Sequence, residues 1–121
     1  MEYCNIVENE SHSATNLPYA TKKRLELARA LMGNPRILVL DEPAASMDEE
    51  ERAQYCQVVL DYVETFSTTL IVVEHDVEII KTLCNRAIAV DAGEVIADGE
   101  VIPVLRNDKV INLYLGTKGA K

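Results

Sequence analysis

The most constraining feature of the sequence is an aliphatic run that ends in two acids and a proline. Ile37-Leu38-Val39-Leu40 passes directly into Asp41, Glu42 and Pro43. An unbroken apolar run of this length, closed by a chain breaker, predicts a strand buried on both faces of a parallel sheet. Because ligands of open α/β sheets bind at the carboxyl ends of the strands, we expect both acids at the functional edge of the sheet.

Two adjacent carboxylates at the end of a buried strand indicate a nearby cation. Like charges repel each other and resist desolvation unless an opposite charge is close. Carboxylate oxygens together with water are the ligands that Mg²⁺ prefers. Asp41 and Glu42 are therefore candidates for magnesium chemistry, although a strand followed by two solvated acids fits the same residues equally well.

A basic helix is expected just before this strand. The spacing of apolar residues predicts a helix from Thr21, its N-cap, to Met32, ended by Gly33-Asn34-Pro35. Three consecutive cations, Lys22 to Arg24, stand at the positive end of its dipole, which disfavours each of them by roughly 0.3 to 1 kcal/mol. They form either a solvated basic turn, the simpler interpretation, or a helix N-terminus that meets phosphate. The expected apolar face consists of Leu25, Ala28, Leu31 and Met32.

A second helix and a second strand follow the acids. Asp48, with Glu51 three residues later, predicts a capping box at the start of a long helix. Residues 68–73 predict another buried strand that ends at Glu74-His75-Asp76. At that end, His75 is suited to orienting water and contacting phosphate, or simply to bonding a neighbouring loop. The expected apolar face of the helix consists of Tyr55, Cys56, Val59, Val63 and Phe66.

In the remaining residues the sequence identifies no chemistry. A helix with Val77, Ile80, Leu83 and Cys84 facing inward is expected before a hairpin, in which Gly93 supplies the positive φ of the turn. Asp98-Gly99 is expected to form another turn. The predicted elements are a helix at 77–84, strands at 87–90 and 94–97, and short helices at 101–105 and 110–115.

Composition excludes several classes of protein. A chain of 121 residues with 48% hydrophobic residues is able to bury a core. The formal net charge of −8, with the acids interspersed, argues against nucleic-acid binding. No apolar run is long enough for direct membrane insertion. Cys4, Cys56 and Cys84 are odd in number and outside any CxxC pattern, which predicts reduced thiols rather than a disulfide framework or a zinc site.

Taken in order, these motifs resemble the second half of the ATP-binding subunit of an ABC transporter. A signature-like segment and its helix (17–31) precede a Walker B strand (37–42), a D-loop (45–48) and an H-loop histidine, His75. The resemblance implies an α/β fold, namely a partial P-loop NTPase-like (ABC) sheet with flanking helices that lacks the N-terminal strands and the P-loop.

The resemblance covers residues 17–116, which would be the C-terminal part of the ATPase domain. Residues 1–16 are then expected to be a polar tail or remnant, and residues 117–121 a frayed end. Glu74-His75-Asp76 and the segment 107–116 look most like the subunits of branched-chain amino-acid importers.

The resemblance implies a role for each candidate residue, with ATP and Mg²⁺ bound in the intact protein. Asp41 would hold Mg²⁺ through water, and Glu42 would act as general base or polarise the attacking water. His75 would contact the γ-phosphate, and Asp48 would lie across a dimer interface. The signature residues would place a helix N-terminus against ATP held by the other subunit; they are Leu17, Pro18, Tyr19, Ala20 and Thr21.

The partners implied are a second ATP-binding subunit, in a homo- or heterodimer, and transmembrane permease subunits. Through the permease, the protein would lie at the cytoplasmic face of the plasma membrane, as a peripheral protein in the cytoplasm. No nucleic-acid partner is implied.

The sequence departs from the family pattern in two ways. The usual signature, Leu-Ser-Gly-Gly-Gln, is replaced by residues 17–21, in which Pro18 lacks the hydroxyl and a backbone donor and Ala20 adds a methyl group. The 121 residues also contain no GxxxxGK[ST] motif. We therefore expect the chain alone neither to bind ATP tightly nor to hydrolyse it.

The sequence supports two functions, and the acidic charge and importer-like C-terminus weigh against a third, an ABC-type protein that acts on ribosomes or DNA. The first is the C-terminal fragment of a subunit that powers import of branched-chain or related amino acids by ATP hydrolysis. The alternative is a non-catalytic interaction module that associates with an intact ABC subunit.

Overall fold

A computed structural model describes residue 4 and residues 13–115 of the chain. Its residues divide into two compact units, Met1–Val73 and Glu74–Lys121. The frayed end expected at 117–121 and most of the polar tail expected at 1–16 lie outside the described residues. Within the described part of the chain, no helix combines the length and apolar character needed to cross a membrane.

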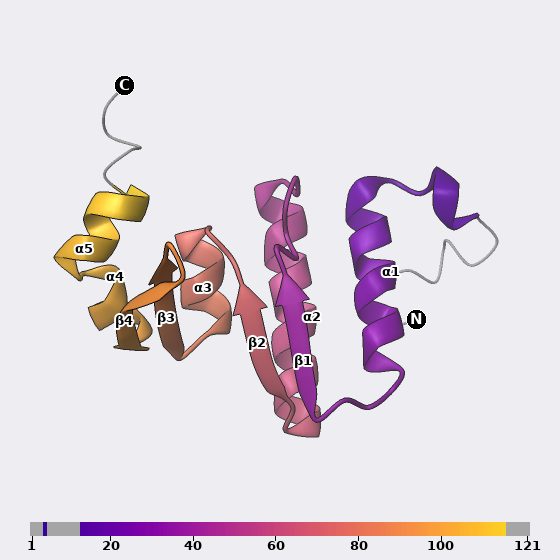
Figure 1. Ribbon diagram of the computed structural model, residues 1–121. Helices are drawn as coiled ribbons and strands as arrows, with labels where there is room; N and C mark the ends of the chain where they lie inside the picture. Colours follow the sequence, from indigo (N-terminus) through magenta and orange to yellow (C-terminus); the bar gives the residue numbers. More distant parts are fainter. Residues whose placement is uncertain (1–3, 5–12, 116–121) are drawn as a thin grey trace. The chain divides into compact units, whose positions relative to one another are not determined.

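The first unit is built on two parallel strands (Figure 1). β1 (Ile37–Asp41) pairs with β2 (Thr69–Val73) in a register that runs from Ile37 opposite Thr69 to Asp41 opposite Val73. Parallel pairing requires a crossover, and α2 provides it. In chain order, the elements are a 3₁₀ turn at Ala14–Asn16, α1 (Tyr19–Leu31), β1 (Ile37–Asp41), α2 (Glu49–Phe66) and β2 (Thr69–Val73).

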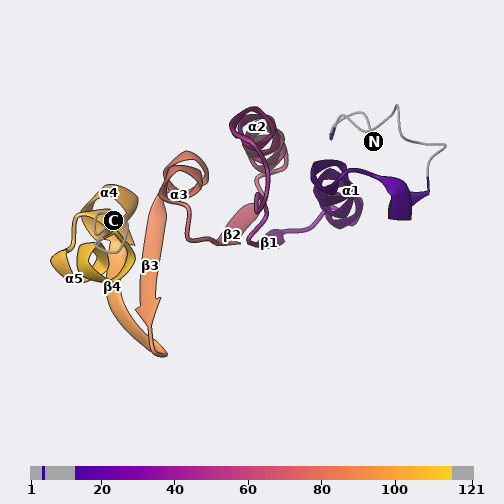
Figure 2. The same cartoon turned by 90° about the horizontal axis from the view of Figure 1, so that it is seen from above.

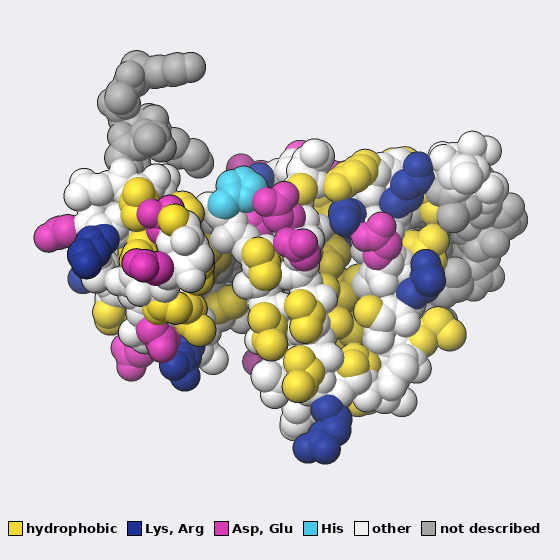
Figure 3. Space-filling model, viewed as in Figure 1, with side chains coloured by type: hydrophobic (Ala, Val, Ile, Leu, Met, Phe, Trp, Pro, Cys, Tyr) yellow, Lys and Arg dark blue, Asp and Glu magenta, His cyan; other side chains and the backbone are white. Residues whose placement is uncertain are grey.

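The prediction that both strands are buried on both faces is wrong for the described residues. Leu38 and Leu40 are buried, and Figure 2 shows α2 lying over one side of the strand pair. Ile37 and Val39 point the other way and are 58% and 60% exposed. Together with the exposed Ile71 and Val73 of β2, they belong to the apolar surface that Figure 3 shows over the strand pair. The apolar run therefore indicated the strand correctly but not how much of it is covered.

The capping box predicted at α2 is confirmed. Asp48 Oδ1 accepts a hydrogen bond from the Glu51 backbone N–H at 2.8 Å, and Glu51 Oε2 accepts one from the Asp48 N–H at 3.1 Å. The helix ends at Phe66, and its C-cap, Ser67, has a φ of 51°, in the left-handed conformation. Of the expected apolar face, Val63 is half-buried and Phe66 is exposed, whereas Tyr62, which was not expected there, is buried. The buried residues of the helix are Tyr55, Cys56, Val59 and Tyr62.

Helix α1 begins earlier than predicted, and its buried face agrees with the prediction at Ala28 and Leu31 only. It starts at Tyr19 with Pro18 as its N-cap, so Thr21 is not the cap. Proline fits there because the first amides of a helix have no intrahelical acceptor. Met32, which was expected to face the core, is 82% exposed. The buried residues of the helix are Ala20, Leu27, Ala28 and Leu31.

Burial of Tyr55 makes the stability of the first unit sensitive to alkali. Desolvation, and to a smaller degree the nearby Cys4 and Cys56 thiols, raises the pKa of the Tyr55 hydroxyl far above its ordinary value. Because the pKa is raised in the folded state, this contribution to stability is complete below about pH 10 and is lost as the pH rises beyond it.

We expect Tyr55→Phe to reduce this loss of stability in alkali. Urea unfolding followed by circular dichroism between about pH 8 and pH 11 measures the effect, and the variant should show a shallower decline in the free energy of unfolding. Tyr19→Phe is the matched control because Tyr19 is exposed, and it should follow the wild type. Parallel declines in all three proteins would contradict the assignment to Tyr55.

The second unit is a hairpin with short helices packed on it (Figure 1). The hairpin turn predicted at Asp91–Gly93 is confirmed, with Ala92 and Gly93 both at positive φ. The turn predicted at Asp98-Gly99 is wrong, because both residues lie within the second strand. Of the inward face expected for α3, Leu83 is buried, but the other buried residue is Ile79. The elements are α3 (Val77–Leu83), β3 (Arg86–Asp91), β4 (Glu94–Glu100), α4 (Val101–Leu105), α5 (Asp108–Val110) and a helical turn at Ile111–Leu115.

Candidate functional site

Asp41 and Glu42 lie at the carboxyl edge of the parallel strand pair. Asp41 is the last residue of β1, and its partner in register is Val73, the last residue of β2. The Glu42 backbone N–H donates a hydrogen bond to the Val73 carbonyl at 2.9 Å, which extends the ladder by one residue. Both acidic residues are exposed. The sheet thus fixes the backbone of two exposed acidic residues.

Glu42 occupies an unusual backbone conformation. Its φ is +42°, a left-handed value that costs free energy for a residue with a side chain. The turn that follows is closed by the Ala45 N–H, which donates to the Glu42 carbonyl at 3.3 Å, and it contains Ser46 at φ 62°. This turn leads into Asp48 and α2. Strained backbone conformations of this kind are concentrated at functional sites. Here the left-handed conformation turns the chain sharply, directly after the strand that carries Asp41.

The donor chemistry of this edge fits Mg²⁺. Magnesium in proteins is commonly held by one or two carboxylates, several waters and substrate phosphates. Asp41 offers one exposed carboxylate on a rigid strand end. Among the described residues there is no group of three or more His, Cys, Asp or Glu side chains that would form an all-protein cage. When bound, the ion would supply positive charge for phosphate oxygens.

The three cations at the start of α1 have partners within the first unit. Lys22 Nζ donates to the Thr15 carbonyl at 3.0 Å. Arg24 donates to the side-chain oxygen of Gln54 on α2 at 2.7 Å. These contacts favour the interpretation of this segment as a basic turn.

Lys23 connects this turn electrostatically to the acidic edge. Its Nζ donates to Glu26 Oε2 at 3.1 Å. The pKa of Lys23 lies above its ordinary value, first because of this hydrogen bond and in smaller part because of the charge of Asp41. Asp41 is thus the smallest of several influences that favour the protonated form of Lys23.

The signature-like segment forms the N-terminus of α1. Leu17 and Ala20 are buried, whereas Pro18 and Tyr19 are exposed. Pro18 offers no side-chain hydrogen bond to the first turn of the helix, and its carbonyl accepts the N–H of Lys22 at 3.0 Å. The amides of Tyr19, Ala20 and Thr21 precede the first intrahelical donor, which is the geometry that binds anions at helix N-termini.

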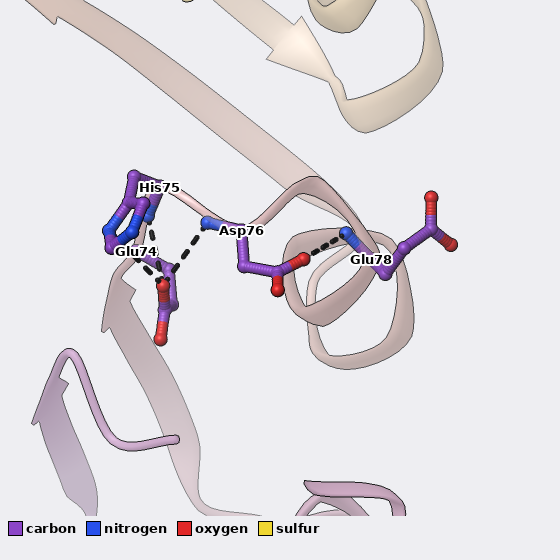
Figure 4. A network of polar contacts seen from close by, with 4 residues as sticks. All are labelled: Glu74, His75, Asp76 and Glu78. Carbon is purple, nitrogen blue, oxygen red and sulfur yellow. Dashed lines mark hydrogen bonds and ion pairs between the residues drawn. The ribbon is translucent and has the colours of Figure 1, made fainter. Parts of the chain in front are cut away.

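His75 stands in a turn organised by its neighbour, Glu74 (Figure 4). The imidazole side chain is 71% exposed, and that of Glu74 only 2%. Asp76 caps α3, since its Oδ1 accepts the Glu78 N–H at 2.9 Å. His75 belongs to the second unit, so its sharing of one triphosphate with Asp41 and Glu42 stays a prediction. The burial of Glu74 was not expected, because the Glu-His-Asp triplet looks uniformly polar in the sequence.

The fold and the acidic edge together define an α/β protein with a parallel sheet and a carboxylate pair suited to Mg²⁺. Comparison with known proteins shows which family within this class the chain resembles. The family model described as "ABC transporter" matches residues 1–45, the part of the chain that ends just after the two acids.

The chain is similar to LivG, the high-affinity branched-chain amino acid transport ATP-binding protein of Salmonella typhimurium. The two are 32% identical over 116 residues, which is 96% of this chain and 46% of LivG. The chain also resembles the crystal structure of the ADP conformation of an ATP-binding cassette of an ABC transporter. That match has a TM-score of 0.82 and 28% identity and covers 95% of this chain and 46% of the cassette.

A second solved structure, a dimeric bacterial ABC transporter cassette, matches with a TM-score of 0.71 and 27% identity over 83% of this chain and 44% of the cassette chain. The resemblance to ABC transporter ATP-binding proteins is thereby confirmed, and the chain has the fold of part of the ABC cassette. It spans about half the length of the relatives that it matches.

Proposed function

We propose that this chain carries the hydrolytic acids of an ABC transporter ATP-binding protein that powers import of branched-chain or related amino acids. The main support is the position of Asp41 and Glu42 at the carboxyl edge of a parallel strand pair. The similarity to LivG extends over 96% of the chain and suggests the class of solute.

In this proposal Asp41, Glu42 and His75 each have a separate role in ATP hydrolysis. Asp41 holds Mg²⁺ through water, and Glu42 removes a proton from the attacking water or polarises it. His75 contacts the γ-phosphate and helps to orient that water. These tasks suit phosphoryl transfer, which depends mostly on positioning and on stabilisation of charge.

A second ATP-binding subunit and the permease complete the proposed assembly. The N-terminus of α1, formed by residues 17–21, approaches ATP held by the other subunit, and Asp48 lies at the interface between them. The similarity to a dimeric bacterial ABC transporter cassette supports the pairing of two such subunits. Transmembrane permease subunits hold the pair at the cytoplasmic face of the plasma membrane. Because the 121 residues contain no GxxxxGK[ST], the groups that cradle the phosphates come from polypeptide outside them.

A chimera with LivG tests the proposed function. In this LivG chimera, the segment of LivG that aligns with the chain over 116 residues is replaced by the aligned residues of the chain. We expect the chimera to hydrolyse ATP in a Mg²⁺-dependent reaction and to restore leucine uptake to cells that lack LivG. A chimera that folds and binds ATP but hydrolyses none would contradict the proposal. A chimera that hydrolyses ATP without restoring uptake would contradict only the assignment of solute.

A further inference from the structure

Glu74 is a buried carboxylate to which the proposed reaction gives no role. Its side chain is 2% exposed, although it lies in the turn between β2 and α3 and next to the exposed His75 (Figure 4). Burying a carboxylate is unfavourable unless it is hydrogen-bonded or paired. The hydrogen bonds that the Glu74 carboxylate accepts therefore offset the free-energy cost of its burial.

One oxygen of Glu74, Oε2, contacts the backbone on both sides of His75 and lies near its ring. Oε2 accepts the backbone N–H of His75 at 3.0 Å and that of Asp76 at 3.2 Å. These two amides flank His75, so the bonds fix the backbone on both sides of its Cα. Hydrogen bonds to an ionised acceptor are about twice as strong as neutral ones. The backbone that carries the imidazole is thus held by its neighbour's side chain.

The same oxygen lies 3.7 Å from Nδ1 of the imidazole. A carboxylate beside Nδ1 favours a proton on that nitrogen, and the geometry of the ring then puts Nε2, with its lone pair, on the opposite edge. A lone pair at Nε2 is able to accept a hydrogen from water. Glu74 therefore defines which edge of the ring is presented for chemistry.

We propose that Glu74 is a positioning residue for ATP hydrolysis, which holds His75 so that Nε2 faces the attacking water. The inference rests on the proposed function of His75. In this proposal Glu74 acts through the imidazole and has no direct part in the chemical step. Such supporting residues commonly contribute between about tenfold and a hundredfold to activity.

The first test is made on the 121-residue chain and needs no nucleotide. Glu74→Gln keeps the volume and one acceptor oxygen but removes the charge. We expect faster hydrogen exchange at the His75 and Asp76 amides and ring ¹⁵N shifts that move toward the form protonated at Nε2. The matched control is Glu78→Gln in the same segment, because the exposed Glu78 carboxylate pairs with Lys81, three residues later, at 2.8 Å. In the Glu78→Gln variant, the ¹⁵N shifts of the His75 ring should equal those of the wild type.

The second test is ATP hydrolysis by the LivG chimera. Glu74→Gln should lower kcat by about tenfold or more with little change in KM, whereas Glu78→Gln should leave both unchanged. Ring shifts that do not respond to Glu74→Gln, or equal kcat values for the two variants, would overturn the proposal. If Glu42→Gln left hydrolysis intact, the proposed function would fail instead, and the ring shifts would still report whether Glu74 orients His75.

Discussion

Replacing Glu42 with glutamine in the LivG chimera is expected to lower the rate of ATP hydrolysis by about a hundredfold or more. Glutamine has the same shape but is not basic, so it leaves the strained backbone of residue 42 as it is and removes the proton acceptor. Binding of Mg-ATP should be unchanged or tighter, because a negative charge next to the triphosphate is lost. Steady-state hydrolysis and equilibrium binding of labelled ATP measure the two effects.

The matched control for Glu42→Gln is Glu94→Gln. Glu94 is an exposed carboxylate at the start of β4, opposite Asp91 in the hairpin. Its replacement removes the same charge from the surface without touching the acidic edge, so hydrolysis should equal that of the unmodified chimera. Similar rates of ATP hydrolysis in the two variants would show that Glu42 is not the general base. A loss of ATP binding in Glu42→Gln would indicate a structural effect.

Truncating Leu27 to alanine is expected to destabilise the first unit by about 3 kcal/mol. Leu27 is 2% exposed and is among the most completely buried side chains described. Its loss combines a hydrophobic transfer cost with the cost of a cavity. Urea unfolding of the 121-residue chain, followed by circular dichroism, should show a lower midpoint with a similar dependence on denaturant.

Met32→Ala is the control for Leu27→Ala. Met32 follows α1 directly and is 82% exposed, so its truncation should change the free energy of unfolding by less than about 0.5 kcal/mol. The two variants also distinguish the observed buried face of α1 from the face predicted from the sequence, which included Met32 and not Leu27. A larger cost for Met32→Ala would favour the predicted face.

Local sequence patterns were enough to identify most elements. The aliphatic run at 37–40 predicted β1, and the Asp48–Glu51 spacing predicted the capping box of α2. The helix at Val101–Leu105 was also predicted with its observed limits. Each of these features depends on interactions between residues that are close in the chain, and the order of the motifs supported the resemblance that the comparisons later confirmed.

Burial and side-chain partners, by contrast, were decided by the tertiary structure. Leu27 and Met32 are both apolar residues of one helical segment, yet one is covered and the other exposed. Val39 lies between two buried leucines and is open to solvent. Glu74 is polar in sequence but enclosed in the fold. The physical reason is that burial depends on which distant segments pack against a residue, and the local pattern of polarity carries no information about those neighbours.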